Sequence, residues 1–403
     1  MGDTKLVPAM RWRILLYWVL NVLVAAVIVR LLLVQGQGGA ILAAARAEIP
    51  SATCGAGTRS SALPLQGADE RRALEPRLAL LFLITDRIEH EDLWIELLAR
   101  GRRGTGSEGA PGPLVLVHAA GSRAELRRRG MNPYFLQRLV PTPVATRWGD
   151  LVGAMRALLR AALAAEATTV EGGGWRVERF AFVSDTTVPL ASVRRMQRVL
   201  LEQGKVATGH SGQCSAFCFA PVVDWPSPQV PKAHQWSVLA REHAVLLAAD
   251  THGSATRSTS SGLSHWFRTF VNGMPLRATA RRAFQSDEVE FTAELWRLGR
   301  QAEAVHSCHT FVWWGERSWF NVAPALLSLS RMTRIGSHPA TFEQVPYAGL
   351  RELVNGHRFL FARKFERGTA VTGAPGELGP NLLSAALLRL IDEDEGLSSP
   401  DNL

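Results

Sequence analysis

The 403-residue sequence is poor in lysine and lacks the common catalytic motifs. Lysine occurs only as Lys5, Lys205, Lys232 and Lys364, so arginine supplies nearly all of the positive charge. There is no Walker loop and no GxSxG, HExxH or GxGxxG sequence, which argues against the enzyme classes that those motifs mark. No Asn-x-Ser/Thr sequon occurs, so N-glycosylation is not expected.

An internal Asp-x-Asp sequence, whose paired carboxylates can hold a divalent cation, is also missing. Asp392 and Asp394 have that spacing, but they lie in the carboxyl-terminal run DEDEGLSSPDNL, which is typical of a frayed, solvated tail. The sequence therefore gives no support for a bound metal.

Cysteine is scarce, with four residues in the chain. They are Cys54, Cys214, Cys218 and Cys308. A zinc site can be drawn from Cys214, Cys218 and Cys308 with His210 and His309, but the spacing matches no standard finger or ribbon. In an oxidising compartment the four cysteines would form disulfides, with three full pairings possible.

The charge balance is strongly basic, with a net charge of +9 and an isoelectric point near 10.1. Such a balance permits an anionic partner such as nucleic acid, anionic lipid or a phosphorylated substrate. The arginines are spread along the chain, and no basic block with interleaved aromatic residues is present. This distribution argues against a nucleic-acid-binding protein.

One long apolar run, residues 14–34, predicts a transmembrane helix, since about 20 apolar residues span a bilayer. Arg30 lies near its end, where a long side chain can reach the interface. Basic residues precede the run and predict a cytosolic tail at 1–13, a stem at 35–75 and a lumenal domain at 76–403. A cleaved signal peptide is the alternative, although its apolar region is usually only about 7–15 residues long.

Predicted strands and helices alternate in the first half of the folded part. Strands are expected at 77–84, 113–119 and 176–184, and helices at 91–101, 148–166 and 191–204. This alternation predicts an α/β fold with a largely parallel sheet. Ligands bind at the carboxyl ends of the strands in such sheets, and the segment FVSDTTVPL begins at one such end.

The second half is less regular. Helices are expected at 234–250, 286–301 and 380–392, short apolar strands at 310–314, 338–342 and 358–365, and a loop at 251–266. No internal repeat is present.

Several segments of the chain resemble one known family. In order they are RLALLFLI, VLVHA, WGDLVGAMRALLRAAL, RFAFVSDTTVPL, PKAHQWSVLAREHAVLL, SDEVEFTAEL, SHPATF and FLFARKF. Together they resemble the core-2/I-branching N-acetylglucosaminyltransferases, glycosyltransferase family 14, and particularly its plant and algal branch. The resemblance runs from about residue 77 to 366, and its most specific part is HPATF followed by FLFARKF.

The resemblance implies a GT-A-like, Rossmann-type domain behind an N-terminal anchor in the Golgi membrane. It implies an inverting transfer of a sugar from a UDP-sugar to a hydroxyl of a glycan or glycoprotein, with no metal and no cofactor. Family members use N-acetylglucosamine, xylose or glucuronic acid. Donor choice depends on a few pocket contacts, and the sequence does not identify the donor.

A metal-free site needs fixed cations to stabilise the negative charge that grows on the departing UDP. The resemblance assigns this role to Lys364, with Arg363 and His338 as further diphosphate-binding residues. A lysine ammonium at the end of a strand suits a phosphate group. If strand alternation holds, Lys364 lies on the face opposite Arg363. The alternative is a strand-end lysine that simply reaches solvent.

Inversion also needs a base to take the proton of the attacking hydroxyl. The resemblance assigns it to Glu288, with Glu290 and Glu294 as fallback candidates. The alternative is local: Asp287 with Glu290 three residues later has the spacing of a helix capping box. Under that reading Asp287 caps the helix while Glu288 projects into the cleft.

The remaining candidates come from the matching segments. The donor or uridine side is assigned to His118, Trp148, Gly149 and Asp185, and the acceptor side to Lys232, Gln235 and Trp236. Ordinary structural roles compete with three of them. His118 can satisfy a strand end, Asp185 can cap the following helix, and Trp236 can belong to the core.

Three departures from the family pattern favour a second hypothesis. Trp313 stands where the family has an aspartate, and Phe284 and Thr187 stand where it has cysteines. The family's disulfide pattern is therefore not carried over. The alternative function is an inactive, membrane-anchored carbohydrate-binding or scaffold protein.

Overall fold

The structure is a computed structural model, and all the residues that it describes belong to one compact unit within 52–403. The described ranges are 74–103, 112–146, 149–167, 174–203, 214–219, 232–249, 286–314, 326–327, 330–333, 338–374 and 382–397. The predicted tail, transmembrane span and stem, the loop at 251–266, Trp148 and Phe284 lie outside these ranges.

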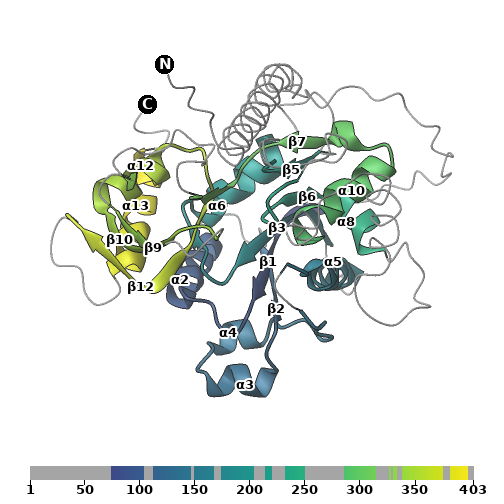
Figure 1. Ribbon diagram of the computed structural model, residues 1–403, viewed down its shortest axis with the longest axis horizontal. Helices are drawn as coiled ribbons and strands as arrows, with labels where there is room; N and C mark the ends of the chain where they lie inside the picture. Colours follow the sequence, from purple (N-terminus) through teal and green to yellow (C-terminus); the bar gives the residue numbers. More distant parts are fainter. Residues whose placement is uncertain are drawn as a thin grey trace, which may run out of the picture. The chain divides into compact units, whose positions relative to one another are not determined.

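Three parallel strands form the centre of the main sheet, as the sequence predicts. β1 (Glu75–Ile84) pairs with β2 (Leu114–Ala119) on one side and with β3 (Trp175–Ser184) on the other. All seven residues from Leu78 to Ile84 are buried, as expected of a strand covered on both faces. The three carboxyl ends therefore lie at one edge of the sheet (Figure 1).

The rest of the main sheet is mixed. β6 (Val238–Ala240) pairs antiparallel with both β3 and β5 (Ser215–Phe217), and β5 pairs parallel with β7 (Ala304–His306). The strand order is β2-β1-β3-β6-β5-β7. This mixed α/β architecture with a parallel-rich sheet fits a Rossmann-like fold.

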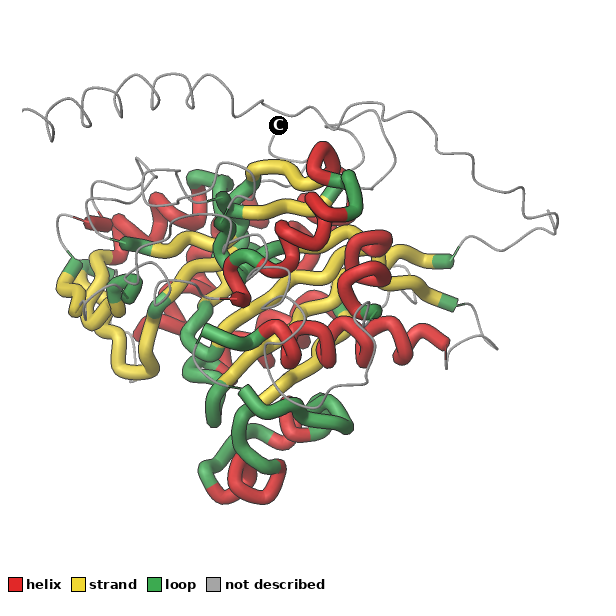
Figure 2. Tube along the Cα trace, turned by 45° about the vertical axis from the view of Figure 1, so that its right-hand side comes forward, coloured by secondary structure: helices red, strands yellow, loops and turns green. Residues whose placement is uncertain are grey.

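Alternating side chains of the strands enter two separate cores, because successive residues point to opposite faces. Leu78, Leu80 and Phe82 belong to one cluster, and Ala79 and Leu81 to the other. Helices α2 (Glu91–Arg103) and α6 (Val193–Gln197), continued by the π-helical turn η1 (Arg198–Gln203), cover the first face, whereas α5 (Val152–Ala167), α8 (Arg241–Ala248) and α10 (Glu290–Arg297) cover the second (Figures 1 and 2).

Two small sheets follow in the second half of the described chain. One has the order β4 (Val188–Pro189), β11 (Phe361–Arg363), β8 (Thr310–Val312), and the other β12 (Phe365–Thr372), β10 (Thr341–Pro346), β9 (Arg331–Thr333). Helices α12 (Tyr347–Asn355) and α13 (Leu382–Leu397) pack with them around a third core, centred on Phe342 and Phe365. The segment 358–365 thus passes from one sheet to the other, and is not the single strand that the sequence predicts.

Two further predictions need correction. Residues 238–240 are a strand and not part of a helix at 234–250, because they pair with both β3 and β5; the helix starts at Arg241. The acidic run at 392–397 continues α13, and does not fray. Asp392 forms an ion pair with Arg100 at 2.6 Å, and Asp394 with Arg195 at 2.5 Å, so α13 is held to α2 and α6.

The zinc hypothesis is wrong, because Cys218 and Cys308 form a disulfide. Cys214 is also disulfide-bonded, and no described cysteine is free. The Cys218–Cys308 bond joins the end of β5, in the main sheet, to the segment just before β8. It therefore links the main sheet to the sheet that contains β11.

Among the residues that the structure describes, no helix combines the length and the apolarity needed to cross a membrane. The span predicted at 14–34 is outside the part of the chain to which this finding applies.

Candidate active site

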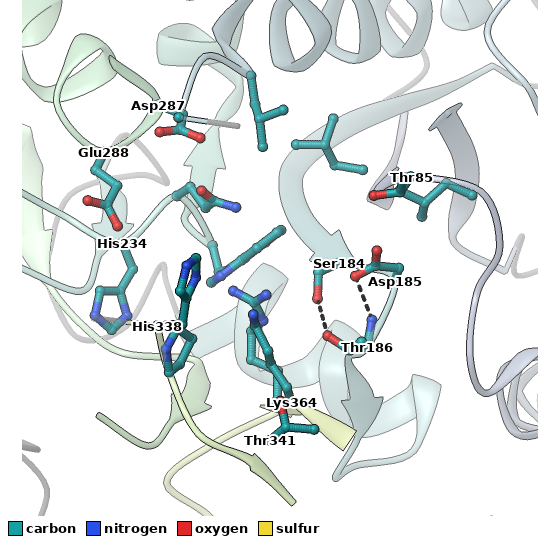
Figure 3. Close-up of a pocket in the computed structure, with 18 of the residues that line it drawn as sticks. Thr85, Ser184, Asp185, Thr186, His234, Asp287, Glu288, His338, Thr341 and Lys364 are labelled. Carbon is teal, nitrogen blue, oxygen red and sulfur yellow. Dashed lines mark hydrogen bonds between the residues drawn. The ribbon is translucent and has the colours of Figure 1, made fainter. Parts of the chain in front are cut away.

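A cavity of about 560 Å³ opens at the carboxyl ends of β1, β2 and β3 (Figure 3). Its wall includes the last two residues of β1, Leu83 and Ile84, with Thr85 after them, Ala120 directly after β2, and the turn Ser184–Thr186, which begins at the last residue of β3. The other lining residues are Thr146, Gly149, Leu151, His234, Gln235, Trp236, Asp287, Glu288, Trp314, His338, Pro339, Thr341, Arg363, Lys364 and Glu366. The predicted location of the site, at the carboxyl edge of the parallel strands, is where the structure has its cavity.

The cavity gathers eight of the sequence-predicted site residues. They are Glu288, Lys364, Arg363, His338, Gly149, Asp185, Gln235 and Trp236. Lys232 does not line it but contacts it through an ion pair with Glu288. His118 is not in its wall, and Trp148 lies outside the described residues.

The cationic wall, as we call Arg363 and Lys364, lies at the junction of the two small sheets. β11 ends at Arg363, and β12 begins at Phe365 and pairs with a different strand. The alternation of a single strand is interrupted there, so both cationic residues line the cavity. The prediction that they occupy opposite faces is therefore wrong.

Arg363 is held by an aromatic ring and not by a carboxylate. Its guanidinium carbon lies 4.2 Å from the ring centroid of Trp236, within the range of a cation–π contact. No hydrogen bond or ion pair joins it to any described residue, and its Nε is enclosed without a partner. Burial lowers the pKa of Arg363 to about 10, although the charges of Asp185 and Glu288 oppose this shift.

Lys364 is the second cation of this wall. Burial is the main cause that lowers its pKa, the neighbouring Arg363 charge adds to the effect, and Asp185 and Glu366 oppose it. Like the Arg363 guanidinium, the Lys364 ammonium forms no hydrogen bond or ion pair within the described part of the chain, although the Lys364 backbone carbonyl accepts a hydrogen bond from the Phe342 N–H. Two partly buried cations in one cavity wall without a salt-bridge partner are unusual, because a buried charge is costly unless it is paired.

The acidic wall, as we call Asp287 and Glu288, is formed by the short 3-10 turn Ser286–Glu288 before α10. In Figure 3 these two carboxylates lie on one side of the view and the Ser184–Thr186 turn on the other, with Lys364 between them. Both are only 7% exposed. Glu288 Oε2 forms an ion pair with Lys232 Nζ at 2.6 Å, so its carboxylate is fixed in place.

The capping-box alternative for this segment is wrong. The N-cap of α10 is Val289, which forms no side-chain cap. Asp287 therefore does not cap this helix, and it lines the cavity. The fallback bases are not in the cavity wall. Glu290 forms an ion pair with Arg156 and Glu294 forms one with Arg297.

The two carboxylates of the acidic wall have raised pKa values for the same main reason, burial. For Asp287 the nearby Glu288 charge adds to this, and its pKa rises to about 7. For Glu288, Lys232 and Arg363 act in the opposite direction by stabilising the charged form. Asp287 Oδ1 is buried without a hydrogen-bond partner, which agrees with a carboxyl group that resists ionisation.

Asp185 does not cap the following helix, because Ser192 is the N-cap of α6. Its Oδ1 accepts a hydrogen bond from the Thr186 N–H at 2.9 Å, which orders the turn after β3 (Figure 3). The Ser184 and Thr187 hydroxyls are 2.7 Å apart and hold the same turn. The second carboxylate oxygen of Asp185 is left for other contacts from a cavity-lining position.

His118 has an ordinary structural role in this fold. It is fully buried, and its Nε2 accepts a hydrogen bond from the Val144 N–H at 2.9 Å. Burial lowers its pKa, so the ring is neutral as that bond requires. Trp236 has both of the roles considered for it. It is 7% exposed and packs in the second core, and it also lines the cavity, where its ring contacts Arg363.

Trp314, His234 and Glu366 are among the cavity residues that sequence reasoning missed. Trp314 lies next to the substituted position Trp313, which packs against the third core and does not line the cavity. The His234 ring is 5.8 Å from the Trp314 ring, and burial together with the nearby Arg363 and Lys232 lowers its pKa to about 3. His234 belongs to the segment PKAHQW, but nothing in the sequence pattern distinguishes it from its neighbours as a site residue.

Within the described ranges, no group of three or more His, Cys, Asp or Glu side chains has an arrangement that could hold a metal ion. Arg363 and Lys364 place positively charged side chains in the wall of this cavity. Opposed cations and carboxylates in one cavity can bind an anionic group at one wall and accept a proton at the other.

Comparison with known proteins gives one partial similarity. No family model matches the chain. Over 181 residues the chain is 26% identical to the glycosyltransferase BC10 of Oryza sativa subsp. japonica, which is 43% of this chain and 41% of the rice protein. The chain thus matches well under half the length of that relative. The similarity supports a relationship to a glycosyltransferase, but it does not select the core-2/I-branching group.

Proposed function

We propose that this protein is an inverting glycosyltransferase that moves a sugar from a UDP-sugar to a hydroxyl group of a glycan or glycoprotein, without a divalent cation. One observation carries the proposal: Arg363 and Lys364 line the cavity without ion-pair partners in the described chain, and Asp287 and Glu288 line the same cavity. The partial similarity to the rice glycosyltransferase supports sugar transfer as the reaction.

The cationic wall suits the diphosphate of the donor. No described carboxylate forms an ion pair with Arg363 or Lys364. A diphosphate bound beside them would supply that negative charge. As the bond from the anomeric carbon to UDP breaks, negative charge grows on the leaving phosphate, and a fixed ammonium and guanidinium stabilise it without reorganisation. His338 lines the same region and completes the proposed diphosphate site.

The acidic wall suits the acceptor. In the proposed reaction the acceptor oxygen attacks the anomeric carbon on the face opposite UDP, and its proton passes to Glu288. Burial raises the pKa of Glu288, which makes it a better proton acceptor, while the ion pair with Lys232 orients the carboxylate and favours its charged form. Gln235 and the turn at Asp185 are the proposed contacts to sugar hydroxyls, and Gly149 the proposed contact on the uridine side.

The fold class and the location complete the proposal. The Rossmann-like sheet, with its cavity at the carboxyl ends of β1 to β3, is the arrangement expected of a GT-A-like domain. The apolar run at 14–34 and the basic residues before it support a single-pass type II anchor with the catalytic domain in the lumen, and we propose the Golgi membrane as its location from the family resemblance alone. The disulfide between Cys218 and Cys308 agrees with an oxidising compartment.

A donor screen tests the proposal. The purified full-length chain in detergent is incubated with a panel of UDP-sugars and mixed glycan acceptors, with and without EDTA. Transfer or slow hydrolysis of one UDP-sugar that persists in EDTA is the expected result. Turnover that requires manganese would overturn the metal-free mechanism. Absence of both UDP binding and turnover would overturn the proposal that the protein is a UDP-sugar-dependent enzyme.

Binding without turnover would instead favour the carbohydrate-binding or scaffold alternative. The substitution at Trp313 motivated that alternative. In the structure Trp313 lies outside the cavity wall, while both carboxylates and both cations are present, so this observation now favours the enzyme.

A further inference from the structure

A basic arm projects from the rim of the cavity. We define it as residues 121–138, which contain α3 (Arg123–Arg128) and α4 (Pro133–Leu136). It contains five arginines and one carboxylate, Glu125. Figures 1 and 2 both show it beyond the carboxyl ends of β1 and β2.

The arm is anchored by apolar residues and presents its charges outward. Leu126 and Phe135 are fully buried, so the short helices are fixed against the sheet. Arg123, Arg127 and Arg128 are exposed, and none forms an ion pair with a described residue. Arg123 and Arg127 are four residues apart and so lie on the same side of the helix. Arg123, Arg127 and Arg128 therefore form an open positive surface.

The arm is continuous with the cavity wall. Ala120 lines the cavity, and its N–H donates to the Ile84 and Thr85 carbonyls, while the Gly121 N–H donates to the Thr85 carbonyl. Arg129, at the end of α3, forms ion pairs with Asp86 and Glu125. A molecule whose reacting hydroxyl lies in the cavity therefore meets the arm as soon as it extends past Thr85 and Ala120.

We propose that the basic arm binds the part of the acceptor that remains outside the cavity, and that this acceptor is a polyanionic glycan rich in carboxylates, such as a polyuronate. The inference rests on the proposed function and adds the substrate class. An exposed cluster of unpaired guanidinium groups attracts carboxylates and fixes their orientation by paired hydrogen bonds. We favour the acceptor over an anionic bilayer because the arm continues directly from the cavity wall through Ala120 and Gly121.

Binding of two matched probes tests the inference. The full-length chain in detergent is titrated with oligogalacturonate and with the same oligomer as its methyl ester, which differs only in charge. The variant is Arg123→Gln with Arg127→Gln and Arg128→Gln; Arg129 is kept because it pairs with Asp86. The control variant removes the same charge elsewhere, through Arg194→Gln, Arg198→Gln and Arg351→Gln, which are also exposed.

The wild type should prefer the acid over the ester, and the arm variant should lose about tenfold in affinity for the acid at low salt, as expected for three exposed ion pairs. Equal losses in the arm and control variants would overturn the proposal, as would equal binding of acid and ester by the wild type. If the arm variant lost binding to phosphatidylserine vesicles but kept oligomer binding, the arm would be a membrane contact. A separate titration of the wild type with UDP tests the proposed donor site. Failure of the donor-site proposal can therefore be distinguished from failure of the proposal for the arm.

Discussion

The two walls of the cavity differ in whether their charges are neutralised. On the acidic wall, Glu288 has a lysine partner at 2.6 Å, and Asp287 resists ionisation through burial. On the cationic wall, Arg363 has an aromatic ring and Lys364 has no described partner. The acidic wall is complete without a ligand, whereas the cationic wall needs an anion to complete it. This difference indicates which wall receives the diphosphate.

Removal of the Lys364 ammonium is the strongest test of this difference between the two walls. Lys364→Ala should lower kcat by about 1,000-fold with the UDP-sugar that the screen identifies, because a fixed charge at the leaving group is lost. Lys364→Arg keeps the charge and should recover part of the activity. Steady-state kinetics on folded protein, checked by circular dichroism, measure both. An alanine variant with near wild-type kcat would remove Lys364 from the mechanism.

The acidic wall should respond almost as strongly. Glu288→Gln preserves size but cannot accept a proton, so kcat should fall by about 100-fold or more while UDP affinity changes little. UDP titration by calorimetry and turnover assays on one preparation separate these effects. Glu290→Gln is the matched control, since Glu290 pairs with Arg156 outside the cavity. Similar kcat values for both variants would mean that Glu288 is not the base.

The ring under Arg363 offers a smaller test of the cationic wall. Trp236→Ala removes the cation–π contact and should weaken UDP binding by about tenfold, because a desolvated contact of this kind contributes up to about 2 kcal/mol. Trp236→Phe should retain part of the affinity. Calorimetric UDP titration of both variants is the measurement. If the alanine variant lost acceptor binding while keeping its UDP affinity, Trp236 would instead be an acceptor platform.

The smallest effect concerns pH and stability. The pKa of Asp287 is raised to about 7 from an ordinary value of 3.8, so between these values the folded protein binds more protons than the unfolded chain. Its contribution to stability is therefore present at low pH and is lost as the pH rises toward 7. Asp287→Asn should raise Tm by about 2 °C at pH 8 and leave it unchanged near pH 4.

Thermal melts at the two pH values measure the Asp287 effect. Asp394→Asn is the control with the opposite sign, because it breaks the ion pair with Arg195 and should lower Tm at pH 8. A lower Tm for Asp287→Asn at pH 8 would show that the folded protein stabilises the Asp287 carboxylate by more than its burial costs.

The sequence predicted the parallel half of the fold well, and the reason is local. The strands β1 and β2 are largely apolar runs, β3 has the apolar run Phe180–Val183 near its end, and the helices between them have clear periodicity, so a local window is enough to predict each element. The strand β6 could not be predicted in this way. Its residues VLA run directly into a helical pattern, and only their pairing with β3 and β5 makes them a strand. Pairing over long sequence separations leaves no trace in a local window.

The candidate site shows the same division. Arg363, Lys364 and Glu288 were assigned from motifs, and the cavity gathers them. The common orientation of Arg363 and Lys364 depends on a change of sheet between β11 and β12, which strand alternation cannot foresee. Trp314 and His234 were missed, since nothing in their own segments marks them.

The helix α13 has a practical consequence for anyone who shortens the chain. Its acidic end has the composition of a dispensable tail, yet Asp392 and Asp394 form ion pairs with α2 and α6, and the preceding turns of α13 bury Leu387 and Leu390 completely. An expression boundary inside 392–397 would remove these ion pairs, and one placed before Leu387 would also open the third core, to which β12 contributes Phe365 next to the cationic wall.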